Sequence, residues 1–182
     1  MKMLLAILLT MHLSIAQEVT PSFALDKTKG GGGGDASEMR VDEIRADLLK
    51  WINEGGSKNL KLPTDVSLEE YNFKMKKLLA PKFTSIIFVE KGTNPEKELT
   101  VDIDGTPKTC RSYFAEKTEK PTILCVISRF ENTPEARQYR FIHHEYAGLG
   151  MLEKNDGIDS DYQISNQVPH FLIPETNLRL SA

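Results

Sequence analysis

The chain has 182 residues, of which 40% are hydrophobic and 27% are charged, and its formal net charge is −3. These proportions are those of an ordinary globular protein, and the length suits one domain with a substantial core. The sequence has no strongly basic block, so nucleic acid is not expected as a partner.

Residues 1–16 have the pattern of a secretory signal peptide. Lys2 supplies the basic start, residues 3–13 form an apolar run, and Ser14-Ile15-Ala16 places small residues before a cleavage site. Residues 22–24 offer a second cleavage site. The apolar run is too short to span a bilayer. We therefore expect an exported protein, periplasmic or extracellular, with no transmembrane segment in the mature chain.

Residues 17–36 contain a run of five glycines, Gly30–Gly34. Such a run has much conformational entropy to lose on folding, so we expect a flexible tail here. The single folded domain is expected to span residues 37–182.

Two amphipathic helices are predicted at the start of this domain, over residues 37–54 and 67–80, because apolar residues recur there at the helical period. In the second helix Ser67 and Glu70 have the spacing of a capping box, and Pro81 marks the end.

The composition then changes to short segments rich in β-branched and aromatic residues, which predict strands. Asp104-Gly105 is typical of a tight turn between two of them. The short connections favour an antiparallel meander of four strands. The predicted strands cover residues 83–91, 98–103, 108–114 and 122–130.

Cys110 and Cys125 are the only cysteines in the chain and lie in the last two predicted strands. In an exported protein, two cysteines on neighbouring strands favour one disulfide. The alternative is a metal site made by both cysteines and a histidine.

Residues 138–151 contain most of the residue types that carry chemistry, and they have a helical pattern. Thr133 is the expected N-cap and Pro134 suits the first turn. At about 100° per residue the predicted helix has two faces. One is an apolar stripe flanked by His143, and the opposite face carries His144, Glu145 and Gly148. The apolar stripe consists of Tyr139, Ile142, Tyr146 and Leu149.

His144 and Glu145 match the first half of the zinc motif H-E-x-x-H, in which two histidines hold the metal and the glutamate acts as general base. The second histidine is replaced by Gly148, which has no ligand atom. A zinc interpretation therefore needs a downstream carboxylate, and the spacing does not single out one of Glu153, Asp156, Asp159 and Asp161. The zinc interpretation makes His144 and Asp161 the candidate metal ligands and Glu145 the candidate catalytic residue.

Two metal-free interpretations remain open for the same helix. In the first, His143 is a hydrogen-bonded structural residue at the edge of the core, and Glu145 bonds groups of the next loop. In the second, the face with His144 and Glu145 lines a binding cleft without a metal.

An acidic loop, residues 155–161, follows this helix. It lacks the ligand order of a calcium loop, so we expect Ser160 or Asp161 to cap a last helix over residues 161–168. Pro169 is expected to interrupt that helix, and Pro174 to keep the tail irregular.

Several of these segments together resemble a family of small exported proteins of predatory Gram-negative bacteria. The densest part is HHEYAGL followed by SDYQISNQV, within a resemblance that spans residues 38–168. It implies export and assigns no catalytic role. A remoter likeness is to zincin metallopeptidases, in which a sheet precedes the HE-bearing helix, although Gly148 breaks the ligand set. Members of the exported family continue as a helix after the ISNQ segment, and Pro169 and Pro174 depart from that pattern.

The expected fold is α+β: two N-terminal helices, a four-stranded antiparallel sheet with one disulfide, and two C-terminal helices. The favoured function is an exported binding or structural module whose His-Glu helix lines a cleft. The alternative function is a zinc-dependent, peptidase-like hydrolase with a non-standard ligand set.

Overall fold

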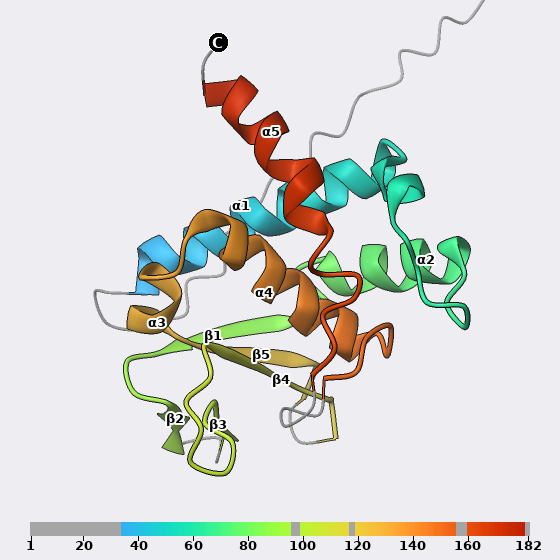
Figure 1. The fold of residues 1–182 in the computed structure, drawn as a ribbon. Helices are drawn as coiled ribbons and strands as arrows, with labels where there is room; N and C mark the ends of the chain where they lie inside the picture. Colours follow the sequence, from blue (N-terminus) through green and yellow to red (C-terminus); the bar gives the residue numbers. More distant parts are fainter. Residues whose placement is uncertain (1–33, 96–98, 117–118, 156–159, 181–182) are drawn as a thin grey trace, which may run out of the picture.

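The computed structural model describes residues 34–95, 99–116, 119–155 and 160–180, which Figure 1 shows as a mixed α/β fold. The expected signal peptide and most of the expected tail lie outside these residues. The helices are α1 (Gly34–Asn53), η1 (Gly56–Asn59), α2 (Leu68–Leu79), α3 (Ile127–Glu131), α4 (Glu135–Leu149) and α5 (Val168–Leu180). The strands are β1 (Ser85–Val89), β2 (Thr93–Asn94), β3 (Leu99–Thr100), β4 (Cys110–Tyr113) and β5 (Thr122–Val126).

The two predicted N-terminal helices are present as α1 and α2. Helix α1 begins at Gly34, inside the predicted tail, and ends where Gly55 adopts a φ of 82°. A Cβ atom on the next residue, Gly56, would lie 2.0 Å from the Trp51 ring, so only glycine lets the chain turn against Trp51. At the start of α2, Ser67 Oγ accepts a hydrogen bond of 3.1 Å from Glu70 N, as the capping pattern predicts.

The sheet differs from the predicted four-stranded antiparallel meander. Its order is β1-β5-β4, with β1 parallel to β5 and β4 antiparallel to β5, while β2 and β3 form a separate two-stranded ladder. Strand β5 is buried along its whole length. A continuous apolar run such as its TILCV segment is typical of a central strand covered on both faces. The order of strands along the chain does not reveal this central position.

All four predicted strands are shorter in the structure than in the prediction, and two of them differ in more than length. The segment 122–130 leaves the sheet after Val126 and continues as α3, because a short apolar run suits a strand or a buried helical turn equally well. The segment 98–103 pairs only through β3. The predicted turn after it is confirmed, with φ of 47° at Asp104 and 75° at Gly105.

Alternate residues of β5 face two different apolar clusters. Ile123 and Cys125 belong to the main core with the helices, whereas Leu124 and Val126 pack with residues of β3 and β4 on the other face. Helix α4 contacts β4 on one side and α1, α2 and α5 on the others, so it runs through the middle of the molecule (Figure 1).

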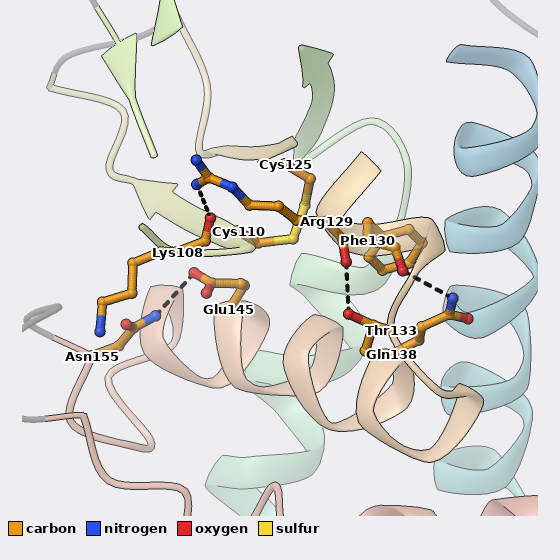
Figure 2. The surroundings of a disulfide bond; sticks show 9 residues. All are labelled: Lys108, Cys110, Cys125, Arg129, Phe130, Thr133, Gln138, Glu145 and Asn155. Carbon is orange, nitrogen blue, oxygen red and sulfur yellow. Dashed lines mark hydrogen bonds between the residues drawn. A yellow bond between two sulfur atoms is a disulfide. The ribbon is translucent and has the colours of Figure 1, made fainter. Parts of the chain in front are cut away.

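Helix α4 starts one residue later than predicted, because its N-cap position is Pro134 and not Thr133. The Thr133 hydroxyl instead donates to the carbonyl oxygen of Arg129 at 2.7 Å, which ties α4 to the end of α3 (Figure 2). The Gln138 amide reinforces the link by donating to the Phe130 carbonyl oxygen at 3.2 Å.

The prediction for the C-terminal helix was wrong. Residues 163–167 form turns, and α5 then runs from Val168 with Pro169 in its first turn and Pro174 inside it. Proline in a first turn loses no helical hydrogen bond, so Pro169 starts the helix and does not interrupt it. Asp161 caps no helix, since its Oδ1 accepts a bond of 3.0 Å from Gln163 N within the turns. None of the helices in the described ranges has the length and apolar character needed to cross a membrane.

Candidate functional site

Both faces of α4 are buried in its C-terminal half, while its first turns include exposed residues such as Arg137. The exposed fraction is 0% for His143 and His144 and 4% for Glu145. On the face that we expected to line a cleft, His144 stacks on Tyr162 and Glu145 bonds Asn155, so neither side chain is open to solvent. The reason is that the sheet covers one side of α4 while α1, α2 and α5 cover the other, which a helical wheel cannot reveal.

His143 lies between two hydroxyl groups from distant parts of the chain. Its Nε2 is 2.8 Å from the Tyr71 hydroxyl of α2, and its Nδ1 is 2.6 Å from Ser165 Oγ. Ser165 also donates to Glu153 Oε2 at 2.5 Å. Because that bond uses the only hydroxyl proton of Ser165, His143 Nδ1 is the donor to Ser165 and Nε2 accepts from Tyr71.

The ionisation of these groups agrees with this assignment. Burial lowers the pKa of His143 from 6.5 to about 4, so the ring is neutral at neutral pH. Burial also raises the pKa of Tyr71, which keeps its hydroxyl proton available for donation. His143 is therefore a neutral link between α2, α4 and the turns before α5.

Glu153, just after α4, is the centre of the network. Its two oxygens accept four hydrogen bonds: from His144 Nδ1 (2.8 Å), from the Ser165 hydroxyl (2.5 Å) and from the backbone N–H groups of Ile164 (2.5 Å) and Ser165 (2.7 Å). Burial alone would raise its pKa, but the hydrogen bonds from His144 and Ser165 outweigh burial and lower it. Glu153 is thus a carboxylate with its acceptor capacity filled.

His144 stacks on Tyr162, with ring centroids 3.7 Å apart, while its Nδ1 bonds Glu153. Its Nε2 is buried and has no hydrogen-bond partner among the described residues. The bond to Glu153 and the stacking on Tyr162 therefore fix the orientation of the His144 ring, and only its Nε2 is left without a hydrogen bond.

Glu145 faces β4 and the loop after α4. Its Oε2 accepts a bond of 3.1 Å from the Asn155 amide (Figure 2). The same amide donates to Ser112 Oγ of β4 at 3.2 Å. Burial raises the pKa of Glu145. Asn155 packs so closely on α4 that a Cβ atom at Gly148 would lie 2.6 Å from its side chain. Gly148, which replaces the second histidine of the zinc motif, therefore makes room for Asn155.

The predicted disulfide between Cys110 and Cys125 is confirmed, and both free cysteines and the alternative Cys–Cys–His metal site are thereby ruled out. It joins two residues directly opposite each other in β4 and β5. Figure 2 shows it on the side of the sheet that faces α4, close to Glu145. Arg129, on the other side of the bridge in that view, donates to the Lys108 carbonyl oxygen at 2.6 Å.

A pocket of about 610 Å³ lies at the C-terminal end of α4. Helix α4 lines it through Gly148, and the loop after α4 lines it through Glu153 and Asn155. These two residues are the hydrogen-bond partners of His144 and Glu145. Helix α4 therefore does line a pocket, through Gly148. His144 and Glu145 do not line it themselves, but each bonds a residue that does.

The described residues do not fit a zinc site. The carboxylate on His144 Nδ1 and the unpartnered Nε2 are features of a zinc ligand. However, the other candidate ligand, Asp161, is exposed and lines the pocket, whereas His144 is fully buried. No group of three or more His, Cys, Asp or Glu side chains in the described ranges is placed to hold a metal ion.

No protein-family model, curated protein or solved structure matches this chain. The site is therefore interpreted from its own geometry. The sequence pattern pointed to His143, His144 and Glu145, but it gave no role to their partners Tyr71 and Ser165. The one signal for Ser165 was its place in the SDYQISNQV segment that carries the resemblance.

Proposed function

We propose that this chain is an exported binding module. Its ligand site is the pocket at the end of α4, and the polar groups of α4 hold the fold that shapes it. The observation that carries this proposal is the pocket of about 610 Å³, a size typical of small-ligand sites, built against a rigid hydrogen-bonded core. A catalytic role for Glu145 has less support, because its carboxylate is buried and bonded to Asn155.

A pocket-filling variant tests the binding site. Gln163 is exposed and lines the pocket, so Gln163→Trp fills the space without removing a core side chain. Compounds and short peptides of different charge are screened for a rise in the melting temperature of the wild type, since a ligand that binds only the folded state stabilises it. We expect this rise to disappear in Gln163→Trp.

The matched control is Arg137→Trp, which places the same side chain on an exposed position of α4 outside the pocket. It should keep the ligand response of the wild type. Ligands that stabilise Gln163→Trp as strongly as the wild type would place the binding site elsewhere and refute the proposal.

Export is the second part of the proposal and is supported by the signal-peptide pattern of residues 1–16, by the resemblance to an exported family, and by the disulfide. The mature protein is expected to start at Gln17, or at Leu25 if the second site is cleaved. Sequencing the N-terminus of the protein recovered outside the cytoplasm tests this. An intact Met1 would contradict it.

A zinc-dependent hydrolase is the second candidate, although the described residues do not form a zinc site. The observation that favours it is the unpartnered Nε2 of His144, next to Glu145 in the chain. Metal analysis of the purified protein decides between the two functions. About one zinc ion per chain, lost in His144→Ala, would favour the hydrolase.

A further inference from the structure

Negatively charged groups outnumber positively charged groups among the described residues that line the pocket. Its described lining residues include three carboxylates, Asp65, Glu153 and Asp161, and one ammonium group, Lys154. Glu153 is buried and its oxygens are filled by four protein donors, so it is not free to bond a ligand. Asp65 and Asp161 are exposed. Lys154 is exposed as well, so a ligand first meets two carboxylates and one ammonium group. With Glu153 the described lining keeps a net negative charge, and the field inside the pocket favours a cation.

Apart from Asn155 and Gln163, the rest of the described lining is apolar, and two of its large side chains are exposed. Met151 is 75% exposed and Phe114 is 45% exposed, and both line the pocket with Pro63, Val66 and Leu152. A ligand with an alkyl stem would remove this apolar surface from water. The face of an aromatic ring such as Phe114 also attracts an ammonium group.

We infer that the pocket binds a primary amine carried on an alkyl stem, such as a lysine side chain or a free diamine. The stem packs on Val66, Phe114 and Met151, and the ammonium group lies between Asp65 and Asp161. This inference rests on the proposed binding function and gives it a ligand class. A negatively charged ligand would meet a lining with a net negative charge, and an uncharged one would gain nothing from that charge.

The test compares probes that differ in charge and little in shape. Nα-acetyl-lysine methylamide, its norleucine analogue, its glutamate analogue and cadaverine are titrated into the ¹⁵N-labelled full mature chain, and amide shifts are followed by NMR. The lysine derivative, cadaverine or both should shift the amides of residues 64–66, 151–155 and 161–163. The norleucine and glutamate analogues should bind at least about tenfold more weakly.

Variants assign the binding to the two carboxylates. The double variant Asp65→Asn/Asp161→Asn should weaken amine binding about fivefold, and added salt should weaken wild-type binding in the same direction. Glu38→Gln removes an exposed carboxylate of α1 outside the pocket and should have no effect.

The two amine probes separate the sources of the ligand. Binding of cadaverine alone supports the amine inference with a free diamine as ligand, and binding of the lysine derivative supports it with a polypeptide side chain. Equal binding of the norleucine or glutamate analogue at the same amides would overturn the amine inference and leave the binding function standing. If no probe shifts the pocket amides, and no screened ligand is sensitive to Gln163→Trp, both proposals fail.

Discussion

The surroundings of three buried residues in and after α4, His143, Glu145 and Glu153, account for the direction of their pKa shifts. His143 is neutral because it is buried between Tyr71 and Ser165, and Glu153 is a carboxylate because four donors bond it. Glu145 has a raised pKa because its burial outweighs the hydrogen bonds it accepts from Asn155 and Ser112. The pKa shifts of His143 and Glu145 therefore follow from burial and hydrogen bonding in the fold and do not require a catalytic role.

The first prediction concerns the pH dependence of stability. His143 has a pKa of 6.5 in the unfolded chain and about 4 in the folded protein. Between these pH values the unfolded chain binds a proton at His143 that the folded chain does not. The contribution of the neutral His143 to the free energy of unfolding is therefore fully present above pH 6.5 and is lost as the pH falls toward 4. Between pH 7 and pH 4 the free energy of unfolding of the wild type should fall by about 3 kcal/mol more than that of His143→Gln.

Urea denaturation at a series of pH values measures this difference. Glu145 changes the free energy of unfolding with pH in the opposite direction, because its pKa is raised in the folded protein. Since both proteins contain Glu145, this contribution cancels when their curves are compared. Parallel curves for the two proteins would contradict the assignment. An NMR titration of the His143 ring gives a second readout, with a midpoint expected near pH 4.

The second prediction concerns Gly148 and Asn155. In the wild type, Gly148→Ala should displace Asn155, because the new Cβ would lie 2.6 Å from that side chain. The lost bond to Glu145 costs about 1–3 kcal/mol, which exceeds the gain of about 1 kcal/mol in helix propensity. In an Asn155→Gly background the clash is absent, so the same substitution should stabilise the protein by about 1 kcal/mol.

This change of sign is measured as a double-mutant cycle of unfolding free energies. If Gly148→Ala stabilises both backgrounds, Asn155 does not need the space, and Gly148 has another role.

At the scale of elements, the sequence predicted individual helices and the disulfide better than the way the strands pair. Helices α1, α2 and α4 follow from the apolar period, and the disulfide follows from two cysteines on neighbouring strands. The parallel pairing of β1 with β5 could not be predicted, because register and neighbour choice depend on which helices cover the sheet. For the same reason the helical wheel of α4 could not show that both His144 and Glu145 are buried.

The candidate site shows the same limit. His143, His144 and Glu145 were recognised from residue type and spacing. Their partners come from other elements, Tyr71 from α2 and Ser165 from the turns before α5, and only tertiary packing brings them within 3 Å of the ring of His143.

The third prediction concerns the disulfide between β4 and β5. It closes a separation of 15 residues, for which the chain-entropy model gives about 3 kcal/mol. Reduction of the wild type should lower its free energy of unfolding by about this amount. The double variant Cys110→Ala/Cys125→Ala should not respond to the reductant. An unchanged urea midpoint on complete reduction would show that the bridge contributes no stability.

At the scale of the whole molecule, α4 connects the core to the pocket. It contacts the sheet and the helices α1, α2 and α5, and at its C-terminal end the loop that carries Glu153 and Asn155 forms part of the pocket wall. The same hydrogen bonds that hold the fold thus fix the shape of the wall. This separation of roles, with the polar core for stability and the pocket for binding, is the central claim.

Urea unfolding of His144→Ala, beside the exposed-site control Arg137→Ala and with metal analysis of the wild type, tests that claim most directly. His144→Ala removes the bond to Glu153 and the stacking on Tyr162. It should lower the free energy of unfolding by about 1–3 kcal/mol, the control should change it by less than about 0.5 kcal/mol, and the wild type should carry no stoichiometric metal. Unchanged stability of His144→Ala, together with the loss of a zinc ion bound to the wild type, would contradict the account.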